Sequence, residues 1–216
     1  MVRTNHRRLS LTALAVCLGT LVCHAQYHVI PGDTDRDGCS GKEPARICTG
    51  STGTEHCYIP PTEKTYTFGL EPKAVAAGQL NGQPLILFSA VFSGCGSGTL
   101  TDYSLLTIRN GDFVKLSPKI QLTEQSQNQL WRLSQISLFP ILITADFLWD
   151  FKTETHFSHH RYAIHAYVFD PNTGHYLEKL HFETNRKYAG LDDAEEIHVL
   201  ESERPNVILQ LKHPRR

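Results

Sequence analysis

From residue 66 onward the sequence pattern is mostly that of β-strands, in which apolar residues tend to recur at every second position. The clearest example is residues 160–183, where the alternation continues on both sides of the turn Asp-Pro-Asn-Thr-Gly at 170–174. Pro and Gly favour a chain reversal at such a turn, so the pattern predicts an antiparallel hairpin. On its return strand, regular alternation places Tyr176, Leu180 and Phe182 on one face, and His175, Lys179, His181 and Glu183 on the other.

Two Asn-Gly pairs predict further hairpins, because Asn and Gly readily adopt the positive φ of tight hairpin turns. The first pair, at 81–82, precedes an apolar run at 85–92, and the second, at 110–111, separates apolar runs at 105–108 and 113–116. Consecutive hairpins predict a meander. The run at 85–92 is apolar at nearly every position, which predicts a central strand covered on both faces.

The period changes to three near the C-terminus, where apolar residues between 191 and 200 predict a short amphipathic helix over 193–201. After Pro205 the sequence leaves two alternatives, a second short helix or a strand over 207–211. The predicted fold is therefore mainly β: an antiparallel meander or two packed sheets, sandwich-like or a partial barrel, with one or two short C-terminal helices.

The segment 1–25 has the composition of a signal peptide: three arginines, a mostly apolar run at 9–22, and a small-x-small cleavage site that ends at Ala25 before Gln26. The run is shorter than the about 20 residues that cross a membrane, and no later segment fits a span either. Valines precede Cys17 and Cys23 where a lipoprotein signal has small residues, which argues against a lipid anchor. The sequence thus predicts a secreted or periplasmic protein that does not span a membrane.

Charge narrows the expected partners. Without the segment 1–25 the chain has 18 Lys and Arg against 22 Asp and Glu. Phosphate binding needs clustered Lys and Arg, so this balance argues against nucleic acid. The expected partner is an unidentified ligand in the envelope or outside the cell.

Four cysteines remain after cleavage, Cys39, Cys48, Cys57 and Cys95. An even number in an exported protein predicts two disulfides, and three connectivities are open. Because three of the four lie between 39 and 57, at least one bridge should staple the N-terminal segment, and Cys95 should tie that segment to the body. Residues 26–61 are rich in Gly, Pro, Ser and Thr and lack apolar periodicity, so we predict an irregular arm followed by one β-rich domain over 62–216.

Asp33, Asp35 and Asp37 alternate in the run Asp-Thr-Asp-Arg-Asp-Gly, which is the opening of a calcium-binding loop. Three carboxylates at this spacing can converge on one hard cation, and the glycine permits the turn between them. An EF-hand needs Glu at the twelfth position, which here is Pro44, so that motif is excluded. Two interpretations stay open: a looser calcium loop, which makes calcium the one cofactor that the sequence suggests, and a plain Asp-rich turn.

His156, His159 and His160, with carboxylates nearby, are the candidates for a transition-metal site. Their spacing is the difficulty, because on a strand His156 and His160 align while His159 points away. On a helix His156 and His160 would share a face, but residues 152–158 have the pattern of a loop. A metal site and a polar loop between two strands both stay open. Elsewhere, surface or half-buried strand positions are expected for His165, His175 and His181.

The stretch FxWDFxxxxHFxxHRYxIxxYxFDPxTGxY at 147–176, followed by KYxGLDxAxxI at 187–197, resembles an uncharacterised family of small exported bacterial proteins. The two segments cover about a fifth of the chain. The resemblance implies export and a bacterial source, and it brings no known activity with it.

The sequence favours a non-catalytic exported module that binds something in the envelope or outside the cell, because no nucleophile, base and acid can be assembled with any specificity. The alternative is a metal-dependent hydrolase that uses the region from His156 to His160. Aromatic residues are dense between 147 and 176, and at this density they build a core more often than a carbohydrate-binding groove.

Overall fold

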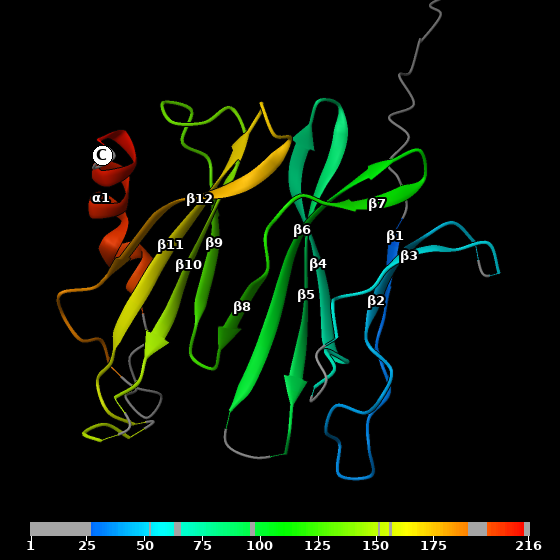
Figure 1. Ribbon diagram of the computed structural model, residues 1–216, viewed down its shortest axis with the longest axis horizontal. Coiled ribbons are helices and arrows are strands. Elements are labelled where there is room, and N and C mark those ends of the chain that lie inside the picture. The colour runs from blue at the N-terminus through cyan, green and yellow to red at the C-terminus, as the bar shows by residue number, and fades with distance from the viewer. Residues whose placement is uncertain are drawn as a thin grey trace, which may run out of the picture.

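A computed structural model describes residues 27–51, 53–62, 66–95, 98–150, 152–155, 157–189 and 198–213. In this part of the chain the elements form four layers, which lie side by side in Figure 1: a helix, a four-stranded sheet, a five-stranded sheet and the three-stranded sheet of the N-terminal arm. All pairings between these strands are antiparallel, so the prediction of a mainly β fold with packed antiparallel sheets is confirmed. The predicted signal peptide and its cleavage site lie outside the described residues. Within the ranges given above, no helix is long and apolar enough to cross a membrane.

The five-stranded sheet is built from hairpins with Asn-Gly turns. Its strands are β4 (Leu70–Leu80), β5 (Gln83–Ser93), β6 (Thr99–Arg109), β7 (Asp112–Lys115) and β8 (Ile120–Thr123). Both predicted turns are present: Asn81 and Gly82 join β4 to β5, Asn110 and Gly111 join β6 to β7, and all four residues have φ between 50° and 91°. Strand β5 is an inner strand whose side chains enter the core on both faces, as its apolar pattern predicts.

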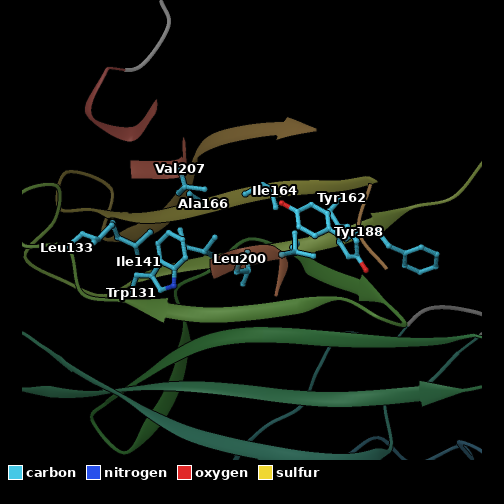
Figure 2. Packing of buried hydrophobic residues seen from close by; sticks show 13 residues of the cluster. Trp131, Leu133, Ile141, Tyr162, Ile164, Ala166, Tyr188, Leu200 and Val207 are labelled. Atoms are coloured by element: carbon cyan, nitrogen blue, oxygen red, sulfur yellow. The ribbon is translucent and has the colours of Figure 1, made fainter. Parts of the chain in front are cut away.

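The four-stranded sheet contains the predicted hairpin over 160–183. Its strands are β9 (Gln127–Trp131), β10 (Ile141–Leu148), β11 (Arg161–Asp170) and β12 (His175–Glu183), in the order β12-β11-β10-β9. We call the face that packs against the five-stranded sheet its inner face, and Leu142, Tyr167 and Tyr176 lie there in the core. The outer face is covered by helix α1 (Val199–Lys212), and Figure 2 shows Leu200 and Val207 of the helix among the side chains of this face.

The C-terminal helix is one continuous element, so the alternative of a strand over 207–211 is wrong. The predicted helix over 193–201 falls mostly outside the described residues. Pro205 lies inside α1, where it cannot donate a hydrogen bond to the carbonyl of Glu201. Both residues are exposed, so water can take the place of that bond, while Val207 on the opposite side is fully buried. Burial of this apolar side therefore outweighs the loss of one helical hydrogen bond.

The N-terminal arm contains regular structure where the sequence predicts none. It forms a sheet of β1 (Tyr27–Ile30), β2 (Arg46–Thr49) and β3 (His56–Tyr58). Strands of three or four residues are too short to show a period in the sequence, which is why the pattern misses them.

Two cysteine pairs at disulfide distance hold the arm, as predicted. Cys48 and Cys57 face each other across β2 and β3, with 4.1 Å between their Cα atoms. Cys39 pairs with Cys95 beyond the end of β5, with 5.5 Å between the Cα atoms. One pair therefore staples the arm internally and the other ties it to the five-stranded sheet.

Candidate functional site

The histidine site predicted at 156–160 is not assembled by the described residues. His156 lies outside them, His159 is exposed, and the adjacent His160 is fully buried. Within the described residues, neither His159 nor His160 belongs to a group of three metal-ligand side chains. A metal-dependent hydrolase in this region stays a prediction.

His160 is held by a carboxylate from the preceding loop. Its Nδ1 lies 3.1 Å from Oε2 of Glu154, which also accepts the backbone N–H of Asp150 at 3.0 Å. Lys187 donates from Nζ to the other oxygen, Oε1, at 2.6 Å. The bond from Lys187, followed by that from Asp150, lowers the pKa of Glu154 to about 2. The side chain of Glu154 is only 8% exposed and that of His160 is 0% exposed. We therefore interpret these contacts as structural: they hold the loop that contains Glu154 against the segment after β12 that contains Lys187.

The Asp-rich turn in the arm uses two carboxylates to bind its own backbone. Asp33 Oδ1 accepts the N–H of Glu43, and this bond is the main cause of the lowered pKa of Asp33. Asp35 Oδ1 accepts the N–H groups of Asp37 at 3.0 Å and Cys39 at 2.9 Å. Among the residues whose structure is described, the ligand atoms of the three aspartates do not gather within 4.8 Å of one another. The contacts are those of an Asp-rich turn, and calcium binding stays a prediction.

Asp146 on the inner face of β10 joins the two large sheets. Its Oδ1 accepts the N–H of Thr123 at 3.0 Å and the hydroxyl groups of Thr123 and Ser126. Thr123 ends β8 of the five-stranded sheet, and Ser126 precedes β9. This carboxylate therefore fixes the crossing from one sheet to the other.

Asp102 on β6 lies beneath the arm and is 1% exposed. Its Oδ2 accepts the hydroxyl of Ser104 at 3.1 Å, and that hydroxyl lies 2.9 Å from the hydroxyl of Tyr58 on β3. Burial raises the pKa of Asp102, and it raises the pKa of Tyr58 to about 12. This chain of polar contacts ties the arm to the sheet.

Most of the described aromatic residues between 147 and 176 build the core, as the sequence favours, whereas Phe157 is exposed. Exposures of 9% or less are found for Phe147, Tyr162, Tyr167, Phe169 and Tyr176. The hydroxyl of Tyr176 donates to the carbonyl of Pro140 at 3.0 Å inside this core. Their faces are therefore covered by other side chains, and they do not line a groove for a carbohydrate.

One group of polar side chains meets solvent on the hairpin β11–β12. His165, Glu178 and His181 place a ring nitrogen, a carboxylate oxygen and a second ring nitrogen within 4.8 Å of one another. We call these three residues the His–Glu–His group. Among the described residues one other group meets this criterion, Asp35 with Cys39 and Cys95, and there both sulfur atoms are paired with each other.

The geometry of the His–Glu–His group is compact. His165 Nδ1 lies 3.1 Å from Glu178 Oε1, and the rings of His165 and His181 stack with 4.4 Å between centroids and 10° between planes. The ring of Tyr167 also stacks with that of His165, with centroids 6.2 Å apart. The side chain of His165 is 22% exposed and that of Glu178 is 43% exposed. The group is therefore open to water while resting on the buried ring of Tyr167.

A β-bulge assembles this group. His165 faces His181 directly across the strand pair, Ala166 faces Leu180, and then Tyr167 faces Glu178. The extra residue, Lys179, reverses the alternation, so Glu178 falls on the same face as His181 although the two are three positions apart. The prediction of regular alternation along β12 is therefore wrong: the core positions Tyr176 and Leu180 lie on opposite faces of the sheet.

The His–Glu–His group ends a polar row that crosses the inner face. In the strand register His181 faces His165, His165 faces Thr144 on β10, and Thr144 faces Asn128 on β9. The neighbouring positions on this face, Leu142 and Tyr167, belong to the apolar core. Polar residues thus interrupt an otherwise apolar face where β12 reaches solvent.

Sequence reasoning misses this group, because it treats His165 and His181 as ordinary strand residues. The available signal is the register of the hairpin, because the turn pairs Asp170 with His175 and so places Glu178 opposite Tyr167, on the face of His165. His181 has no such signal, because continued regular pairing places Leu180 opposite His165, and only the extra residue Lys179 brings His181 there.

Comparison of the chain with protein-family models, with curated proteins and with solved structures finds no significant match. Which of the polar clusters described above is the best candidate for a functional site is therefore decided by geometry and burial. The contacts at Glu154, Asp102 and Asp146 join buried or partly buried parts of the fold, whereas the His–Glu–His group faces solvent.

Proposed function

We propose that this protein is an exported, non-catalytic module that binds a ligand in the bacterial envelope or outside the cell, and that the His–Glu–His group is the ligand-binding site. The observation that carries the proposal is the convergence of three polar side chains on solvent, at the end of a face that is otherwise core. Polar side chains that converge at the edge of an apolar layer are typical of ligand sites.

Export is supported by the composition of the segment 1–25, and two cysteine pairs at disulfide distance are compatible with an oxidising compartment. Ligand binding is supported by the exposure of the group, because the contact between His165 and Glu178 lies where both side chains are open to water.

The proposal is tested by NMR on the chain that begins at Gln26, with isotope labels in the histidine rings. The probes are chemically defined: divalent metal ions, dicarboxylates and soluble peptidoglycan fragments. We expect one class to cause saturable shifts of the His165 and His181 ring signals while the signal of His175, an exposed histidine at the start of β12, stays unchanged.

Two results would overturn the proposal. One is that no probe shifts the His165 and His181 signals selectively. The other is chemical conversion of a bound probe, seen as new ligand resonances, because conversion means that the protein is a catalyst.

A further inference from the structure

We infer that the His–Glu–His group holds a divalent transition-metal ion. This inference rests on the proposed function, because it names the ligand of the same group. It also goes beyond the metal site expected from the sequence, since that site involves a different set of histidines at 156–160.

The donor atoms select the class of metal. Two imidazole nitrogens and one carboxylate oxygen are a donor set of Zn²⁺ and other first-row transition metals, whereas Ca²⁺ and Mg²⁺ favour oxygen ligands alone. Three protein ligands leave at least one position for water or another ligand. The donor set therefore indicates an open transition-metal site with a position for a further ligand, and not a closed structural site.

The present positions of the side chains are close to those that a metal requires. Ligand atoms around a tetrahedral zinc ion lie about 3.3 Å apart, given metal–ligand distances of about 2.0–2.1 Å. In the group they already lie within 4.8 Å of one another. Only small movements of side-chain ends separate the two arrangements.

Ring rotation provides most of this movement. The lone pair of an imidazole nitrogen lies in the ring plane, but an ion midway between two stacked rings would lie outside both planes. The planes of His165 and His181 differ by only 10°, so at least one ring must turn about its Cβ–Cγ bond when the ion binds. This torsion has broad, shallow minima, so the turn costs little. Binding is therefore expected to break the stack of the two histidines.

The backbone supplies a rigid platform. The two histidines face each other across β11 and β12, and the bulge at Lys179 brings His181 onto the face of Glu178. A simple ion pair between His165 and Glu178 accounts for two members of the group but gives no role to His181. A shared metal ion accounts for all three.

The test is a titration with zinc chloride at pH 7.5, by calorimetry and by equilibrium dialysis with elemental analysis, on the untagged chain that begins at Gln26. We expect one zinc ion per chain. Loss of even an outer partner of a metal ligand costs about 10- to 100-fold in affinity, so H165A and H181A are each expected to weaken binding by about 100-fold or more, and E178Q by about 10-fold.

The matched controls are H175A and E183Q, which remove the same chemical groups from exposed positions of β12 outside the group. Both are expected to bind zinc like the wild type. Circular dichroism and thermal unfolding report whether each variant folds, and the exposed positions of Glu178 and His181 mean that their variants should fold normally.

Absence of stoichiometric zinc in the wild type overturns the inference, and so does equal weakening in H175A and H165A. If zinc does not bind stoichiometrically but another probe shifts the NMR signals of His165 and His181, the metal inference is wrong and the proposed binding function stands. If no probe shifts them, both are wrong.

Discussion

Replacement of Glu154 tests whether its buried contacts stabilise the fold to the extent that the geometry implies. In E154A the Nδ1 of His160 loses its partner while the ring stays fully buried, which costs about 1–3 kcal/mol. Lys187 is 52% exposed and can turn to water, so its loss adds little. With the lost packing of the side chain, we expect E154A to lower the free energy of unfolding by about 3 kcal/mol.

The conservative variant E154Q keeps a carbonyl oxygen that can still accept from His160 but loses the charge that folding favours, so we expect a loss of about 2 kcal/mol, between the losses for E154A and for an exposed pair. The matched control is E183Q, because Glu183 is 54% exposed and its oxygen lies 3.4 Å from Arg161. An exposed pair of this kind contributes about 0–1 kcal/mol. Urea unfolding followed by tryptophan fluorescence measures all three variants at pH 7.

The effect also has a pH signature. The pKa of Glu154 is about 2 in the folded protein and 4.5 ordinarily, so folding favours its ionised form. The stability from this carboxylate is therefore fully present above pH 4.5 and is lost as the pH falls from there toward 2. The difference between wild type and E154Q should shrink over this window. The reasoning would be refuted if E154A were as stable as E183Q. It would also be refuted if the difference in free energy of unfolding between the wild type and E154Q did not change with pH.

The contacts of Asp146 and the two cysteine pairs also carry predictions. D146A removes the acceptor of the Thr123 amide and of two hydroxyls, so we expect the free energy of unfolding in urea to fall by about 2 kcal/mol. We also expect faster hydrogen exchange at the Thr123 amide, with no change at the amides of β4. Unchanged exchange at Thr123 would contradict this role. The Cys39–Cys95 and Cys48–Cys57 pairs close loops with separations of 56 and 9 residues, so replacing both cysteines by serine is expected to cost about 4 kcal/mol for the first and about 3 kcal/mol for the second. A larger loss for the shorter loop would show that strain or contacts, and not loop length, decide the difference.

Local turn chemistry explains which strands could be predicted from the sequence. The Asn-Gly turns at 81–82 and 110–111 are present because both residues tolerate the positive φ that a tight hairpin imposes, whatever the rest of the chain does. The arm strands could not be predicted, because each has only three or four residues and is held by pairing and a disulfide. Where α1 is one continuous helix, the sequence predicts a helix that ends before Pro205 and then a second short helix or a strand, because Pro interrupts most helices unless, as here, the lost bond lies on an exposed side.

The candidate sites depend on contacts between distant residues, which the sequence pattern does not contain. His160 and His159 are adjacent in the chain, yet one is buried and the other exposed, so their proximity in the sequence does not make a joint site. Conversely, the His–Glu–His group joins residues from two strands, and one of them reaches its place only through a bulge. A lysine at the bulge gives no local signal, because bulges of this kind accept ordinary residues.

Deletion of Lys179 tests the register that assembles the group. Because this residue has no cross-strand partner, its removal leaves a regular ladder with every other side chain on its present face. We expect the deletion variant to melt within about 4 °C of the wild type, which corresponds to about 1 kcal/mol or less. Deletion of Leu177 is the matched control, since it moves Tyr176, which is 1% exposed, from the core to the opposite face. Loss of a buried aromatic residue costs about 3–5 kcal/mol, so this control should melt about 10 °C lower or fail to fold. Equal destabilisation by the two deletions would mean that Lys179 is not the extra residue and that Glu178 does not share a face with His181.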